Sequence, residues 1–289
     1  MAPKKNETAL AVAENFQIAN RYENIDPELL AELQDELADL DPESGISCLQ
    51  IKIPSGSSSA YEVQTEDDDS EPMKKIEAVL VFTHRANGYW PEAYGSDDGN
   101  KAPVCSSMDG KTAIWADTGE VRSCENCPYN DYGTAVDQKG QQTRGKACKN
   151  MRRLYLMMSG DPNLYLLTVP PTSIKEVNKQ LAKIIGSGTP YTGMVTILSL
   201  EKTKNANGVD YNKVVLQKGQ PLPPAVAAQA VAIRQRIKEQ YKNVALTLDD
   251  YTTAAPADQA PSTVTASAEV QDAQFEEAPA SEAGELPFA

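Results

Sequence analysis

The chain has 289 residues, 40% of them hydrophobic and 6% aromatic, which is enough for one large domain or two ordinary ones. It contains no apolar run long enough to span a membrane and no apolar stretch behind the N-terminal lysines, so we expect a cytoplasmic protein without a secretory signal. A net charge of −14 would by itself argue against nucleic-acid binding.

The charge is unevenly distributed along the chain. Residues 1–44 carry a net charge of −8, residues 45–71 carry −5 and residues 249–289 carry −9, whereas residues 72–248 carry +8. A basic middle between acidic arms is suited to binding a polyanion while an acidic segment competes for the same surface. We therefore expect an acidic N-terminal segment (1–44), a nucleic-acid-binding domain (45–248) and an acidic tail (249–289) that its composition predicts to be disordered.

The first predicted element is a short helix that begins after Asp26. Asp26 is a favourable N-cap, Pro27 suits the first helical position, and leucines recur at helical spacing from Leu29 to Leu40. We expect the apolar face of this helix to pack on the domain. Binding to a partner is the alternative.

Strands and a long insert follow. The alternation in residues 46–53 predicts a half-buried strand, residues 54–72 indicate a flexible acidic loop, and the β-branched run 75–83 predicts a strong strand. Between residues 85 and 149, Gly, Asp, Asn, Ser and Pro interrupt every pattern. So long a segment with little regular structure is unusual in a compact domain, and we expect a bound metal to hold insert 85–149 together.

Regular structure is predicted again from Arg152 onward. Two apolar strands flank a turn at 159–163, a helix runs to about residue 185, two strands joined by an Asn-Gly turn follow, and a last helix ends near residue 242. This order predicts a β-rich α+β domain: an OB-fold-like barrel with a zinc-binding loop insert and flanking helices. Other β-rich domains fit the same order.

Four of the five cysteines lie in the insert at a spacing typical of structural zinc. Cys124 and Cys127 form a C-x-x-C pair that brings two thiolates to one turn. Cys105 and Cys148 stand 18 and 20 intervening residues away on either side, close to the separation in paired zinc sites. We predict that these four bind a structural Zn²⁺. Four thiolates leave no open coordination position, so the site should not be catalytic.

Other interpretations of the cysteines are a redox pair, disulfides and an iron–sulfur cluster. A redox C-x-x-C belongs at a strand-to-helix junction rather than in a loop, and an odd number of cysteines without a secretory signal disfavours disulfides. His84, the one histidine, is an alternative fourth ligand in place of Cys105. The fifth cysteine, Cys48, falls within a predicted strand and is expected to be buried.

Basic and aromatic residues gather in and beside the insert. Six bases and no acid occur between residues 139 and 153, and aromatic rings cluster in the loop-like sequence before them. Basic side chains bind phosphates and aromatic rings stack on nucleobases, which favours a single strand over a duplex. Alternatively, the rings form a small core around the metal and the charges are merely solvated. The predicted contacts are Lys139, Arg144, Lys146, Lys149, Arg152, Arg153, Tyr89, Trp90, Trp115 and Tyr132.

The tail ends in glutamates followed by Leu286, Pro287 and Phe288. Two of the four phenylalanines in the chain, Phe275 and Phe288, lie in this stretch, which has no core to bury them. We predict that residues 286–288 bind a partner's pocket while the acids steer them toward a basic rim.

This ending resembles the acidic tails of bacterial and phage single-stranded-DNA-binding proteins, which finish in acids and a Pro-Phe pair and recruit replication and repair enzymes. In this chain Ala289 follows the pair. The middle, CSSMDG…SCENCPYN…GKACKNMRRLYL, is similar to phage and prophage proteins with the same cysteine insert. Zinc within an OB body is similar to the helix-destabilising protein of the T-even phages, which uses one histidine and three cysteines at other spacings. The resemblance covers about residues 76–248 and the last dozen.

The resemblance implies a single-stranded-DNA-binding protein of phage DNA replication, recombination or repair, in the cytoplasm of a bacterial host cell. We expect it to recruit replication or recombination proteins through its tail and not to be an enzyme. The alternative is a zinc-ribbon transcription or replication factor that binds duplex DNA or a polymerase. For a nuclease or primase, the sequence offers neither clustered metal-binding carboxylates nor a phosphate-loop motif.

Overall fold

A computed structural model describes residues 13–21, 25–39, 46–54, 58–91, 102–137, 140–204, 208, 210–247 and 250. Its strands are β1 (Leu49–Lys52), β2 (Tyr61–Gln64), β3 (Ser70–Met73), β4 (Lys75–Tyr89), β5 (Cys105–Ser107), β6 (Thr112–Trp115), β7 (Val121–Ser123), β8 (Cys148–Met158), β9 (Tyr165–Val169), β10 (Met194–Lys204) and β11 (Asp210–Pro221). Its helices are α2 (Pro27–Asp39), α3 (Pro171–Gly186) and α4 (Pro224–Gln240), with 3₁₀ turns η1 (Pro128–Asn130), η2 (Tyr191–Gly193) and η3 (Tyr241–Asn243).

The described strands form one mixed sheet. Its hydrogen-bonded order is β3-β2-β1-β9-β8-β4-β5-β6-β7, and the β10–β11 hairpin joins through β4. The β1–β9 pair is parallel and the other pairs are antiparallel. The predicted β-rich α+β class is therefore confirmed. The sheet is not closed, so the closure expected of an OB-fold-like barrel is not found among the described strands.

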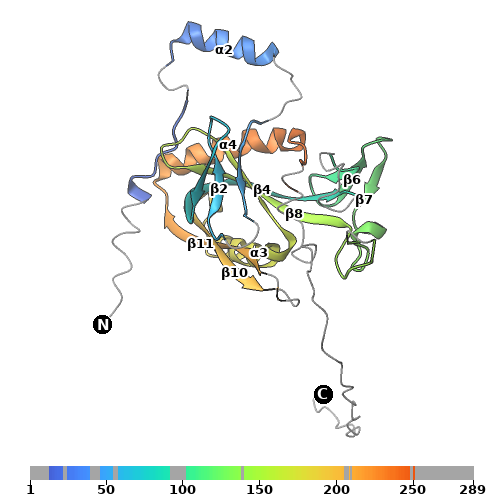
Figure 1. Ribbon diagram of the computed structural model, residues 1–289. Coiled ribbons are helices and arrows are strands. Elements are labelled where there is room, and N and C mark those ends of the chain that lie inside the picture. Colours follow the sequence, from blue (N-terminus) through green and yellow to red (C-terminus); the bar gives the residue numbers. More distant parts are fainter. Residues whose placement is uncertain are drawn as a thin grey trace, which may run out of the picture.

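The long β4–β8 ladder forms the centre of the sheet, and helices cover both of its faces (Figure 1). On one face, which we call the front face, Leu80 and Leu154 pack against Val177 of α3. On the opposite, back face, Val79 packs in a second core with Ile237 of α4. Burying apolar side chains on both faces explains why β4 and β8 each contain a continuous apolar run, at residues 78–82 and 154–158.

Most of the predicted elements are present, and two of the predicted loops contain strands. Residues 54–72 were expected to form a flexible loop, yet β2 and β3 pair there as a hairpin that buries Tyr61 and Val63. The insert begins later than predicted, because β4 continues through Tyr89. Within it, β5, β6 and β7 extend the same sheet antiparallel to one another.

Helix α2 forms as predicted but does not pack on the domain. The amide of Glu28 donates to Asp26 Oδ1 at 2.9 Å, which confirms the N-cap. Leu29 is 56% exposed, none of the α2 side chains that the structure describes is buried, and the helix stands apart from the sheet in Figure 1. The expected packing is therefore wrong. Within the described ranges, no helix is long and apolar enough to cross a membrane.

Candidate functional site: a four-cysteine cavity and a basic strand ladder

Four of the five cysteines surround one cavity at the end of the β4–β8 ladder. Tyr89, the last residue of β4, pairs with Cys148 of β8 on one side and with Cys105 of β5 on the other. Directly paired residues project to the same face of a sheet, so these two cysteines flank Tyr89 on the front face. Cys124 and Cys127, which follow β7, line the same cavity. The structure thus brings together all four predicted zinc ligands.

Local turns position the C-x-x-C pair. Asp109 Oδ1 accepts the amide of Lys111 at 2.7 Å and closes the β5–β6 turn. The carbonyl of Lys111 in turn accepts the amide of Cys124 at 2.7 Å. On the other side, the amide of Asn130 donates to the carbonyl of Cys127 at 2.9 Å, and its Nδ2 donates to the carbonyl of Cys124 at 2.8 Å. Backbone and side-chain bonds therefore fix both ends of the pair.

The electrostatics of the cavity are those of thiols held close together. Burial, and after it the proximity of Cys124, Cys127 and Cys105, raises the pKa of the Cys148 thiol to about 12. A bound cation would reverse this effect by holding the sulfurs as thiolates. No histidine or carboxylate lines the cavity, and four sulfurs are a typical donor set for structural zinc.

All five cysteines are free, so no disulfide joins the four sulfurs of the cavity. In the part of the chain that the structure describes, no group of three or more His, Cys, Asp or Glu side chains forms a ready-made metal site. The cavity therefore supplies the donors rather than a finished coordination geometry.

Two of the rings predicted to stack on bases form the wall of this cavity. Tyr89 is stacked on Tyr129, with 4.3 Å between ring centroids and 19° between planes. Trp115 lies 6.1 Å from each of these rings, and the guanidinium of Arg122 stands 4.6 Å from the Trp115 centroid. These rings form the small core around the cysteines that was the alternative to base stacking.

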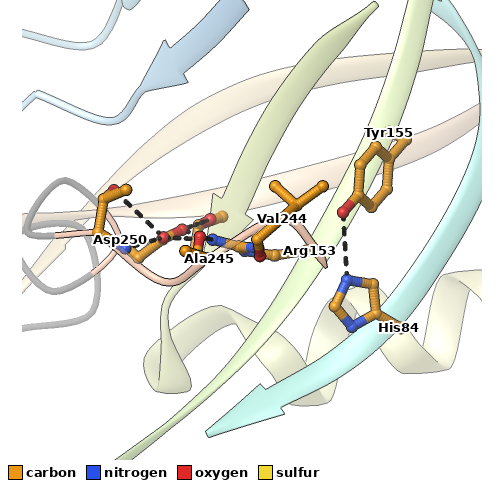
Figure 2. Close-up of polar contacts among 8 residues, drawn as sticks. His84, Arg153, Tyr155, Val244, Ala245 and Asp250 are labelled. Carbon is orange, nitrogen blue, oxygen red and sulfur yellow. Dashed lines mark hydrogen bonds and ion pairs between the residues drawn. The ribbon is translucent and has the colours of Figure 1, made fainter. Parts of the chain in front are cut away.

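His84 lies elsewhere, on the back face of β4. Its Nδ1 approaches the carbonyl oxygens of Arg85 at 2.9 Å and Met108 at 2.8 Å, so this nitrogen carries the proton and donates. The hydroxyl of Tyr155 donates to Nε2 at 3.4 Å (Figure 2). Burial lowers the pKa of His84 to about 4, although the two carbonyls favour the charged ring. The structure therefore brings Cys105, and not His84, to the other three cysteines.

Strand β8 divides the predicted basic cluster between the two faces of the sheet. Successive strand residues point to opposite faces, so Arg152 lies on the front face opposite Arg85, while Arg153 lies on the back face. Lys149 also lies on the back face, is buried, and donates from Nζ to the Lys146 carbonyl at 3.2 Å. Arg153 and Lys149 are inside the protein, so their prediction as surface contacts is wrong.

Of the predicted bases that precede β8, the structure describes Arg144, which is exposed, and Lys146, which is half-buried. Tyr132 is 82% exposed, and Lys146 Nζ stands 4.8 Å from its ring centroid. Lys146 Nζ also donates to Asn130 Oδ1 at 3.2 Å, which holds it in place. Arg144 is exposed nearby in sequence, and Lys139 lies outside the described residues.

Arg153 anchors a C-terminal strap, residues 241–247 and 250, across the back face (Figure 2). The guanidinium is 1% exposed and pairs with Asp250, with 2.5 Å between Nη2 and Oδ2. Its other donors reach the carbonyls of Val244 at 2.7 Å and Ala245 at 2.6 Å. Asp250 had been assigned to the acidic tail, but it is buried and belongs to the domain.

Trp90 belongs to the packing beneath this strap. It is buried in a small core with Ala86, Met151 and Leu246 of the strap. Gly88 makes room for it, because a Cβ at this position would lie 2.4 Å from Trp90 Cζ3. The prediction of Trp90 as a surface contact for bases is therefore wrong.

Beside the predicted Arg152, the front face of the ladder carries four polar residues that sequence reasoning missed. Beyond the apolar core, β4 presents Thr83, Arg85 and Asn87 there, and β8 presents Arg152 and Asn150 opposite them. Asn150 Nδ2 donates to Asn87 Oδ1 at 2.9 Å, and Arg152 Nη1 donates to Thr83 Oγ1 at 3.0 Å. The signal was the alternation of polar residues in 83–87, which becomes informative once β4 is extended past residue 83.

Comparison with models of protein families, with curated proteins and with solved structures gave no match. The predicted partner-binding residues Leu286, Pro287 and Phe288 lie outside the described residues.

Proposed function

We propose that this protein binds single-stranded DNA through the insert and the front face of the β4–β8 ladder, and that it acts in phage DNA replication, recombination or repair. The observation that carries the proposal is the exposed ring of Tyr132 beside the half-buried Lys146 on the insert. An exposed ring beside a fixed ammonium group offers a base a stacking face and offers its phosphate a counter-charge at the same place. The DNA strand would lie across the open β4–β8 ladder, so this mode of binding does not require the closed barrel of an OB-fold.

The proposal includes a structural zinc ion held by Cys105, Cys124, Cys127 and Cys148. Its support is the convergence of four thiols, contributed by three separated segments, on a cavity that no histidine or carboxylate lines. Zinc would supply tetrahedral cross-linking of β5, the turn after β7 and the start of β8. The insert contains only short strands, so such a cross-link would hold the Tyr132 segment at a fixed position relative to the ladder.

Zinc binding is tested by elemental analysis of the purified full chain. We expect one zinc per chain, lost in the variant Cys124→Ser/Cys127→Ser. Cys48→Ser is the matched control, because Cys48 lies in the back core and should leave the zinc content unchanged. His84→Gln should also keep its zinc, whereas loss of metal in that variant would return the histidine to the ligand set.

DNA binding is tested by fluorescence anisotropy with labelled oligo-dT, oligo-U and a duplex of equal length. We expect the oligo-dT complex to be the tightest. Tyr132→Ala should weaken it roughly 5- to 150-fold, the equivalent of about 1–3 kcal/mol for one stacked base. Tyr132→Phe, which keeps the ring and removes the hydroxyl, is the control and should bind like the wild type.

Two outcomes would overturn this proposal. Equal or tighter binding to duplex would favour a zinc-ribbon factor that reads double-stranded DNA. Absence of binding to any of the three probes would remove the nucleic-acid function altogether.

The acidic tail enters the proposal as the segment that recruits replication or recombination proteins. A synthetic peptide of its last twelve residues should compete with the full chain for such a partner.

A further inference from the structure

One stretch of β4 is unpaired on the side away from β8. Strand β10 pairs with β4 only over residues 75–78, and β5 pairs with it only over residues 87–89. Between these two stretches, no described strand occupies that edge. The 3₁₀ turn η2 lies against β4 and α4. The β5–β6 turn lies beside β4 at Arg85, where a Cβ on Gly110 would stand 3.0 Å from Arg85 Cβ.

Three arginines are linked through Tyr191 of η2, and we call these four residues the arginine site. Arg85 and Arg152 are direct partners across the β4–β8 ladder, an arrangement in which like charges repel. Arg234 of α4 stands 5.5 Å from the ring centroid of Tyr191 in η2. Tyr191 is also an electrostatic neighbour of Arg152, whose pKa is lowered by burial and then by the charge of Arg85. The ring thus lies between the cross-strand pair and the third arginine.

These positive charges have no counter-charge among the residues that the structure describes. None of the ion pairs formed among the described residues includes Arg85, Arg152 or Arg234. The Nε atoms of Arg152 and Arg234 are both buried and have no hydrogen-bond partner in the described part of the chain. Buried donors of this kind are rare in folded proteins, because leaving them unsatisfied costs free energy. An anion seated between the arginines would satisfy them and relieve the repulsion.

We infer that Arg85, Arg152 and Arg234, with Tyr191, form a phosphate-binding site for the backbone of a nucleic-acid strand. The inference rests on the proposed function, and it assigns the point at which the strand crosses from the body of the protein to the insert. Along β4, Arg85 stands four residues before Tyr89, about 13 Å at the usual rise of a strand. A strand on this path passes from the arginines over Asn87 and Asn150 toward the insert. A free phosphate ion would bind at the arginines alone, without extending toward the insert.

The test is the salt dependence of oligo-dT binding. Each phosphate contact on a single strand contributes roughly 0.7 to the slope of log K against log salt concentration. Arg85→Gln and Arg234→Gln should each reduce the slope by about this amount and weaken binding several-fold at moderate salt. Lys202→Gln removes the same charge from an exposed residue of the β10–β11 hairpin and should leave the slope unchanged. A thermal melt of each variant checks that it is folded.

The possible outcomes separate this inference from the proposed function. If the wild type does not bind oligo-dT, both are wrong. Suppose that the wild type binds oligo-dT and that Tyr132→Ala weakens this binding. If both arginine variants then keep the wild-type salt slope, only the phosphate site is wrong. A second arm adds inorganic phosphate to the wild type and to Arg85→Gln/Arg234→Gln. An equal rise in melting temperature for phosphate and oligo-dT, found only in the wild type, would identify a small-anion site and overturn the assignment to a strand.

Discussion

Replacing Asp250 with Asn removes the carboxylate that pairs with Arg153 beneath the C-terminal strap (Figure 2). Both side chains are buried, and breaking a buried pair by removing one partner typically costs about 3–5 kcal/mol of unfolding free energy. The guanidinium keeps the carbonyls of Val244 and Ala245 as acceptors, so the lower end of this range, about 3 kcal/mol, applies. For a domain of this size, that corresponds to a fall in melting temperature of roughly 6–12 °C.

The measurement is thermal unfolding of the full chain followed by circular dichroism, supported by urea unfolding at 25 °C. Glu176→Gln is the control, because it breaks the exposed pair with Lys179, whose atoms are 3.8 Å apart. Surface pairs contribute about 0–1 kcal/mol, so this variant should melt close to the wild type. In a double-mutant cycle with Arg153→Met, the two changes should cost less together than the sum of the single changes. A melting temperature of Asp250→Asn within about 1 °C of the wild type would refute the reasoning.

Three further predictions concern the histidine, the ladder and the tail. Burial lowers the pKa of His84 from 6.5 to about 4, so between these two pH values only the unfolded chain gains a proton as the pH falls. The unfolding free energy should therefore fall by up to about 1.4 kcal/mol per pH unit across this range. His84→Gln should flatten this pH dependence when the unfolding free energy is measured with urea. Gly88→Ala places a Cβ against Trp90 and should destabilise by about 1–3 kcal/mol, whereas Gly186→Ala, where a Cβ meets nothing within 4 Å, should be neutral or stabilising by the same melt. Removing residues 254–289, with seven acids and no base, should tighten oligo-dT binding without changing the melting temperature, and weaker binding would contradict competition by the tail.

The elements that the sequence predicted are those specified by local patterns. Strands β8 and β9, helices α3 and α4 and the N-cap of α2 all follow from periodicity, Pro and capping residues within a few positions. The β2–β3 hairpin was not predicted, because the acidic and turn-forming residues of 54–72 indicated a loop. Its signal was nevertheless present, since Tyr61 and Val63 alternate with Glu62, and both apolar side chains are buried.

The error over Arg152 and Arg153 was avoidable from the sequence alone. Residues 152–158 were predicted as a strand, and adjacent strand residues must point to opposite faces. Only one of the two arginines could therefore join a given surface. Which of them is buried could not be predicted, because the carboxylate that holds Arg153 is 97 residues away along the chain, in a segment whose composition indicates disorder.

The cysteine cavity shows why a correct ligand set can come from sequence while its surroundings do not. Spacing alone identifies four cysteines, but strand register decides that Cys105 and Cys148 flank Tyr89 and that His84 points away. The same register continues along the front face to the Arg85–Arg152 pair. A metal ion that fixes the end of the ladder would therefore also fix the position of the insert relative to the arginine site. Metal-depleted protein should then keep the phosphate contacts of the arginine site and lose the contribution of Tyr132, so that its salt slope stays near the wild-type value while its affinity falls.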